Sequence, residues 1–248
     1  MAKVLLVHGA FNEFWGPHEL KARWLPALRD GLWHHDVMID DDEVAVCFYG
    51  DLFRRDPERD DAEAFAASRA GIAEMLAGLD QGGTLEMVSQ AVSDAAFDRT
   101  VDMVTTMMTT PDLRDQVRAR IDDAVGHDTR VVVAHSLGTV IAYQALCRHP
   151  EWQVHTFVTL GSPLGSPMLG DLLDAPVVDG KRAWPGSVQR WVNVAAVGDR
   201  AAAVSSLAEH YDGPVDDRRV DNGHRAHDPE PYLNAAATGA AVADALRA

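Results

Sequence analysis

Apolar residues are concentrated in five short runs that are spread along the chain. Each run is rich in β-branched side chains, a pattern typical of strands that are buried on both faces of a parallel sheet. The pattern therefore predicts five buried strands. They are VLLV at 4–7, VAVCFY at 44–49, RVVVAH at 130–135, VHTFVTL at 154–160 and RWVNVAAV at 190–197.

Helical spacing fills most of the gaps between these runs. Leu20, Trp24 and Leu28 fall on one face of a helix between the first two runs, and TVIAYQAL continues as a largely buried helix after the third. Alternating strands and helices predict an α/β fold with a parallel sheet and right-handed crossovers. Because no hairpin precedes the first run, we expect a reduced sheet of five or six strands, mainly parallel and flanked by helices.

The connection from 51 to 129 is too long for one ordinary crossover, because βα and αβ loops usually take about 2 to 6 residues. Two stripes of helical spacing come first. Thr110 then suits the cap of a third helix and Pro111 its first position, so we take this helix as the crossover. The preceding helices predict a helical cap at about 57–110, inserted into a single domain that spans 1–248.

Composition limits the partners that this chain can have. Its formal net charge of −16 at pH 7 repels phosphate backbones and anionic lipid head groups, so we expect no nucleic-acid partner. The two cysteines provide neither a disulfide framework nor metal-ligand spacing, and we expect no metal and no cofactor. Neither a leader nor an apolar run of membrane-spanning length is present, which predicts a soluble, cytoplasmic protein. No pattern specifies an oligomeric state.

The strongest chemical signal lies where the third run ends, in VVVAHSLGTVIAYQAL. A sharp turn from strand to helix would expose the Ser136 oxygen above the sheet and direct the helix N-terminus at a developing oxyanion. The segment resembles the elbow G-x-S-x-G of the α/β-hydrolase family, with Ala134 at the first glycine and Gly138 at the second. This resemblance implies that Ser136 is a nucleophile; the alternative is a plain strand–turn–helix with an incidental serine.

A second feature is the loop His8-Gly9-Ala10, which follows the first strand. By resemblance to esterases and lipases with an HG-x loop, this is the position of the oxyanion loop. The backbone N–H groups of Leu137 and Ala10 would then bind the oxyanion. Phe11 is the alternative to Ala10, and an ordinary turn is the alternative for the loop.

The acid of such a site should follow a late strand, and Asp199 stands just after the fifth run, behind a turn at Gly198. A carboxylate there could accept the N–H of an imidazole and favour the imidazolium form. A solvated turn aspartate is the alternative. Weaker candidates in the preceding connection are Asp171, Asp174 and Asp179.

The histidine comes last, because the chain order in this fold is nucleophile, acid, histidine. The segment AHDPEPYLNAAATGAAVADAL resembles bacterial esterases and inositol-deacylase-like lipases, in which a histidine directly precedes the C-terminal helix. The resemblance favours His227, with the helix beginning at Tyr232-Leu233. His224 and His210 remain alternatives. His224 and His227 could also bind a metal, but no second group of ligands with matching spacing accompanies them.

Taken together, these features predict a reduced α/β-hydrolase fold that carries a Ser136, His227, Asp199 triad. The predicted activity is hydrolysis of a carboxylic ester, and the predicted substrate is a small-molecule acyl ester or lipid-like molecule. A thioesterase or an acyltransferase would use the same residues. A non-catalytic binding module on this scaffold is an alternative of another class.

Overall fold

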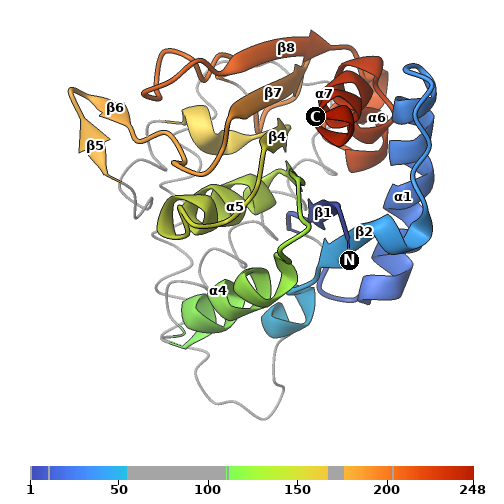
Figure 1. Ribbon diagram of the computed structural model, residues 1–248, viewed down its shortest axis with the longest axis horizontal. Helices are drawn as coiled ribbons and strands as arrows, with labels where there is room; N and C mark the ends of the chain where they lie inside the picture. The colour runs from blue at the N-terminus through green and yellow to red at the C-terminus, as the bar shows by residue number, and fades with distance from the viewer. Residues whose placement is uncertain (1, 11, 55–109, 111, 167–175, 203) are drawn as a thin grey trace, which may run out of the picture.

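The computed structural model describes residues 2–10, 12–54, 110, 112–166, 176–202 and 204–248 (Figure 1). The expected cap at about 57–110 lies outside the described residues, apart from Thr110. Within the described residues, strands and helices alternate along the chain as the apolar runs predict.

Among the described residues, six strands form one sheet in which every neighbouring pair is parallel, in the order β2-β1-β3-β4-β7-β8. The predicted reduced sheet of five or six mainly parallel strands is therefore confirmed. A separate antiparallel pair, β5 and β6, lies between β4 and β7 in the chain. The strands of the sheet are β1 (Val4–Val7), β2 (Val44–Cys47), β3 (Val131–His135), β4 (Thr156–Leu160), β7 (Arg190–Ala196) and β8 (Asp216–Val220), and those of the pair are β5 (Val177–Val178) and β6 (Lys181–Arg182).

Helices cover both faces of the sheet, with α1, α6 and α7 on one side and α4 and α5 on the other (Figure 1). Successive residues of a strand face opposite layers: Leu5 and Val7 pack in the core with α4 and α5, whereas Val4 and Leu6 pack with α1 and α7. All four side chains are fully buried. The helices are α1 (Pro17–Trp33), α4 (Leu113–Ala124), α5 (Leu137–Arg148), α6 (Pro229–Leu233) and α7 (Ala236–Arg247), with 3₁₀ turns η1 (Asp41–Glu43), η2 (Gly50–Phe53), η4 (Pro163–Gly165) and η6 (Gly223–Arg225).

Two helix boundaries differ from the expected ones. The helix α4 has Asp112 as its N-cap, and the backbone carbonyl of Thr110 accepts the first N–H of the helix in a preceding turn, so the expected cap at Thr110 is wrong; Pro111 lies outside the described residues. The C-terminal helix was expected to begin at Tyr232-Leu233, but α6 ends there and α7 follows. Pro229 explains the earlier start, because proline is well suited to the first helical turn.

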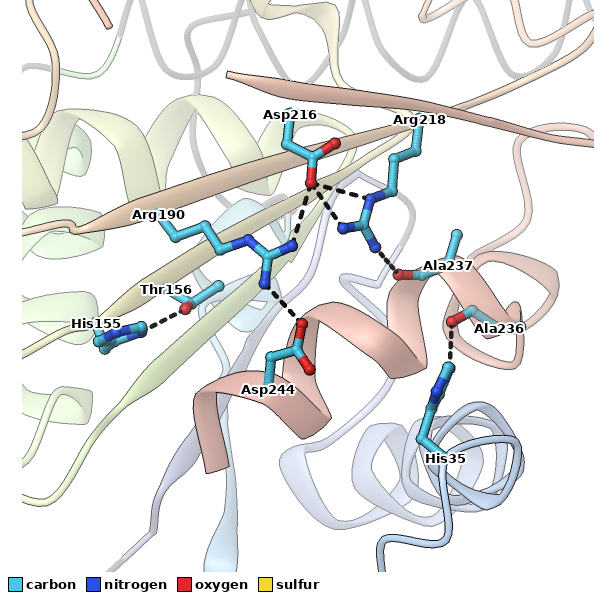
Figure 2. Close-up of polar contacts among 9 residues, drawn as sticks. All are labelled: His35, His155, Thr156, Arg190, Asp216, Arg218, Ala236, Ala237 and Asp244. Carbon is cyan, nitrogen blue, oxygen red and sulfur yellow. Dashed lines mark hydrogen bonds and ion pairs between the residues drawn. The ribbon is translucent and has the colours of Figure 1, made fainter. Parts of the chain in front are cut away.

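The sixth strand, β8, has the charged sequence DDRRV, which hydrophobic patterning does not identify as a strand. Figure 2 shows how its charges are paired on the side of α7. Arg190 on β7 donates to Asp216 (3.2 Å) and to Asp244 on α7 (2.8 Å). Arg218 donates to Asp216 (2.6 Å) and to the carbonyl of Ala237 at the start of α7 (2.8 Å). Charged residues suit an edge strand because they oppose pairing with another sheet.

The helix α1 packs along α6 and α7, so the first and last helices of the chain are neighbours (Figure 1). His35, just after α1, donates through Nε2 to the carbonyl of Ala236 (2.8 Å), as Figure 2 shows. Arg247 at the end of α7 donates to the carbonyl of His35 (2.6 Å). These bonds join the two ends of the described fold around the same face of the sheet.

The sheet order reverses direction between β1 and β3, because β1 pairs with β2 on one side and with β3 on the other. In open α/β sheets, ligands bind at the carboxyl ends of the strands at such a switch point. The loop of residues 8–10 and Ser136 follow the carboxyl ends of β1 and β3. In the part of the chain that the structure describes, no helix is long and apolar enough to cross a membrane.

Candidate active site

Ser136 joins β3 to α5 in a backbone conformation that is uncommon for a residue with a side chain. Its φ is 54° and its ψ is −129°, a combination that typically costs about 1–3 kcal/mol. Two hydrogen bonds hold this turn: the N–H of Ser136 donates to the carbonyl of Leu160 (2.9 Å), and Thr139 Oγ1 donates to the carbonyl of Ser136 (2.7 Å). The turn therefore presents the serine hydroxyl at the carboxyl edge of the sheet.

Small residues surround this turn. A Cβ on Gly9 would lie 2.7 Å from Ser136 Cβ, closer than such atoms approach in real structures, and 3.0 Å from the carbonyl oxygen of His135, which is a tight contact. Ala134 is fully buried in β3, at the position where the G-x-S-x-G pattern has its first glycine. Its single methyl group is therefore accommodated in the core beneath the turn.

A chain of hydrogen bonds connects Ser136, His227 and Asp199. His227 Nε2 lies 2.9 Å from Ser136 Oγ, and His227 Nδ1 lies 3.0 Å from Asp199 Oδ2. With its Nδ1 proton donated to the carboxylate, the neutral imidazole keeps Nε2 free to accept the serine proton. The Asp199 side chain is fully buried, whereas 36% of the His227 side chain is exposed. Solvent therefore reaches the histidine but not the acid.

The alternative histidines and acids lie elsewhere. His224 is exposed in η6, and His210 lies in the turn before Tyr211, where its carbonyl accepts the N–H of Arg182. Asp179 is exposed in the turn between β5 and β6. The remaining two candidate acids lie outside the described residues. They are Asp171 and Asp174.

The Asp199 carboxylate accepts hydrogen bonds on both oxygens. The Tyr232 hydroxyl donates to Oδ2 (2.5 Å), and the N–H of Ala201 donates to Oδ1 (2.9 Å). Burial by itself raises the pKa of Asp199, but the hydrogen bond and charge of His227, together with the Tyr232 hydroxyl, outweigh it and lower the pKa below its usual value. The group is therefore held as a carboxylate at neutral pH.

Sequence reasoning missed two residues beside this carboxylate: Tyr232, which donates to it, and Gly161, whose lack of a side chain leaves room for it. Gly161 has a φ of 54°, and a Cβ there would lie 2.7 Å from Asp199 Oδ2 and 3.2 Å from His227 Nδ1. A side chain at this position would therefore separate the acid from the histidine. The motif GSP after the fourth apolar run was the only available signal for Gly161, and a glycine in a turn has many other uses.

Two buried histidines support the site without joining the hydrogen-bonded chain. His8 donates through Nδ1 to the carbonyl of Gly9 (2.7 Å) and accepts the N–H of Tyr49 at Nε2 (3.2 Å). His135 donates through Nε2 to the carbonyl of His227 (2.8 Å). Burial lowers the pKa of His8 to about 4; burial, followed by the charge of His227, lowers that of His135 to about 3. Both rings are neutral at neutral pH.

The loop after β1 is tied back on itself. Asn12 donates to the carbonyls of Gly9 (3.2 Å) and Ala10 (2.9 Å). Among the described residues, none accepts the backbone N–H of Ala10 or of Leu137, which is the first residue of α5. The first N–H groups of a helix have no partner within it, so the Leu137 N–H is available to an anion. Phe11 lies outside the described residues.

The described residues contain no group of three or more His, Cys, Asp or Glu side chains that could hold a metal ion. A cleft of about 560 Å³ opens at the carboxyl end of β2, next to the residues that follow the loop after β1. Trp15, Phe48 and Arg120 are among its lining residues, whereas Ser136 and His227 are not. The cleft is thus a neighbour of the Ser136 site and not part of it.

Comparison with known proteins identifies the class to which this chain belongs. A family model of the α/β hydrolase fold matches residues 78–237, which is more than half of the chain. The chain therefore belongs to the α/β hydrolase family. No curated protein and no solved structure matches the sequence.

Proposed function

We propose that this protein is a serine hydrolase that cleaves a carboxylic ester through an acyl-enzyme intermediate on Ser136. The observation that carries the proposal is the hydrogen-bonded chain from the buried carboxylate of Asp199 through His227 to Ser136 Oγ. The strained turn at Ser136 and the α/β hydrolase family, whose members are mostly hydrolases, support the same proposal.

In the first half of the reaction, Ser136 Oγ attacks the carbonyl carbon of the ester while His227 Nε2 takes the serine proton. Asp199 holds the imidazole in the required tautomer and stabilises the imidazolium that forms. The imidazolium then gives its proton to the departing alcohol oxygen. The acyl group remains bound to Ser136 as an ester.

In the second half, a water molecule takes the place of the alcohol. His227 accepts a proton from the water as its oxygen attacks the acyl carbon, and then returns the proton to Ser136 Oγ as the carboxylic acid is released. We assign the oxyanion hole of both steps to the N–H groups of Leu137 and Ala10. Each such donor is typically worth about 10²–10³ in kcat.

For the substrate we propose a small or lipid-like acyl ester. The cleft beside the oxyanion loop combines the apolar rings of Trp15 and Phe48 with charged residues, so a substrate that extends into it could carry both apolar and polar groups. The chemistry of Ser136 is the same for an ester and a thioester, so a panel of both kinds of substrate, matched in acyl length, distinguishes an esterase from a thioesterase.

The deciding experiment is incubation of the full chain with a fluorophosphonate probe, followed by mass spectrometry of the modified peptide and by hydrolysis assays with p-nitrophenyl butyrate. We expect the label on Ser136, and loss of both labelling and hydrolysis in S136A with an unchanged unfolding temperature. The matched control is S187A, since Ser187 precedes β7 at the opposite edge of the sheet and its hydroxyl has no partner among the described residues.

Full activity in S136A would refute the assignment of the nucleophile. A folded wild-type protein that neither reacts with the probe nor hydrolyses any ester or thioester would instead favour a binding module on the hydrolase scaffold.

A further inference from the structure

The Tyr232 hydroxyl has no role in the proposed reaction, although it contacts the acid of the site. It lies 2.5 Å from Asp199 Oδ2, one of the two carboxylate oxygens that lie 3.0 Å from His227 Nδ1. The Tyr232 side chain is fully buried at the end of α6. Oδ2 therefore accepts two hydrogen bonds, only one of which comes from the histidine.

The direction of the tyrosine hydrogen bond is fixed by its other partner. The N–H of Ala196, at the end of β7, donates to the Tyr232 oxygen at 2.8 Å. The single hydroxyl proton must then point toward Asp199, because an ionised carboxylate can only accept. Tyr232 is thus a dedicated donor to the acid, held in place by a backbone group of the sheet.

Such a donor has two consequences for the histidine. It restricts rotation of the carboxylate, since Ala201 binds the other oxygen at 2.9 Å, and so keeps both oxygens within 3.0 Å of His227 Nδ1. It also withdraws negative charge from Oδ2, which weakens the stabilisation of a protonated imidazole. The neutral imidazole, which is the form able to take the serine proton, then persists to lower pH.

We propose that Tyr232 is a positioning residue that aligns the Asp199 carboxylate and lowers the pH at which the Ser136 nucleophile becomes active. This inference rests on the proposed serine-hydrolase function. The backbone at Gly161 supports it: a Cβ there would meet Asp199 Oδ2 at 2.7 Å and Tyr232 Cε2 at 3.1 Å, so the position admits no side chain that could push the tyrosine from the acid.

Among the described residues, the other titratable and charged groups that act on Asp199 and Tyr232 come from two strands. His135 at the end of β3 lies with its ring centroid 6.0 Å from that of Tyr232, and it is neutral because burial lowers its pKa to about 3. Arg219 on β8 acts on the Tyr232 hydroxyl as a fixed positive charge and donates to Ser205 Oγ (2.6 Å). Neither group changes charge between pH 5.5 and 9.

The test is the pH profile of Y232F, measured from pH 5.5 to 9 as kcat/KM for p-nitrophenyl butyrate and as the rate of fluorophosphonate labelling of Ser136. Because Y232F removes a hydrogen bond to a charged group, we expect kcat/KM and the labelling rate to decrease roughly tenfold on the plateau of the profile. The acid limb of the profile should move to higher pH by about half a unit or more. When Y232F is combined with D199N, the labelling rate should differ from that of D199N alone by less than about twofold. The reason is that the partner of the Tyr232 hydroxyl is then already neutral.

The matched control is Y211F. Tyr211 is also fully buried and donates one hydrogen bond, to the carbonyl of Leu164 (3.0 Å), without contacting the three residues of the site. Both variants should lose stability to a similar extent, but only Y232F should change the pH profile. A profile of Y232F that matches those of wild type and Y211F would overturn the proposal and leave Tyr232 with a structural role.

A second measurement covers the case in which Y232F does not fold. Replacing the four tyrosines of the chain by 3-fluorotyrosine makes each hydroxyl a stronger donor without removing it, so the acid limb should move to lower pH. An unchanged acid limb would overturn the proposal. Absence of a label on Ser136 in the wild-type protein would overturn the proposed function together with this inference, whereas a labelled wild type with an unchanged Y232F profile would overturn the inference alone.

Discussion

The two buried histidines make the fold sensitive to mild acid. Burial lowers the pKa of His8 to about 4 and that of His135 to about 3, while each would have a pKa near 6.5 in the unfolded chain. Because the folded values lie below the unfolded value, the unfolded chain binds more protons between pH 6.5 and 4. The stability that is present above pH 6.5 is therefore lost as the pH falls through this range.

The size of the loss follows from the constant that relates pKa to free energy. At pH 5, which is 1.5 units below the unfolded pKa, protonation stabilises the unfolded chain by about 2 kcal/mol for each histidine. Both histidines together remove about 4 kcal/mol from the free energy of unfolding, a large part of the roughly 5–15 kcal/mol typical of a domain. The pKa of Asp199 is also lowered, so its protonation begins to reduce the free energy of unfolding only near pH 4 and below.

Urea denaturation at 25 °C, followed by circular dichroism at pH 7.5 and 5.0, measures this difference. The variant H135Q keeps an N–H donor for the carbonyl of His227 but cannot titrate, so we expect it to lose about 2 kcal/mol between the two values where wild type loses about 4. The control H34Q replaces an exposed histidine and should behave as wild type. A wild-type loss below about 1 kcal/mol, or an undiminished loss in H135Q, would refute the reasoning.

Three further predictions, made with four substitutions, concern the site and its surroundings. We expect G9A to lower kcat/KM by about 10²-fold or more while the protein still folds, because the new methyl group must displace Ser136; wild-type kinetics would contradict the close approach. We expect H227A to lower kcat by several orders of magnitude and H224A to leave it within about twofold, so a reversed order in the two assays would move the base to His224. Asp217 accepts four hydrogen bonds, one from Asn193 on β7 and three from residues 206–208 in the segment after Asp199, and D217N should therefore lower the free energy of unfolding in urea by about 2–3 kcal/mol; a loss below about 0.5 kcal/mol would show that the amide replaces the carboxylate there.

Sequence patterning locates those parts of the fold whose local demands restrict the choice of residue. A strand that is buried on both faces requires an apolar run, and a tight turn at its end requires small residues, so β3 and the turn at Ser136 are visible in the sequence. The strand β8 is not, because an edge strand can satisfy charged side chains with partners on β7 and α7. Whether this segment forms a strand depends on tertiary contacts, which a short stretch of sequence does not contain.

The residues of the candidate site also differ in how clearly the sequence indicates them. Ser136 and Asp199 follow apolar strands, and the structure brings them together with His227, which the resemblance to esterases favoured over His224. Tyr232 leaves no comparable pattern, because its contact with the acid joins residues 33 positions apart through a single hydroxyl group. A buried tyrosine near a helix end is equally compatible with plain packing.

The pairing of the first and last helices bears on the order in which the molecule assembles. The bonds of His35 to Ala236 and Arg247 close loops of 201 and 212 residues, and the segment that carries His227 lies just before Ala236. Contacts so distant along the chain form slowly, because the entropy of closing long loops must be overcome first. The histidine therefore reaches Ser136 only when the last helix docks on the first, and enzymatic activity should return during refolding later than the bulk of the secondary structure.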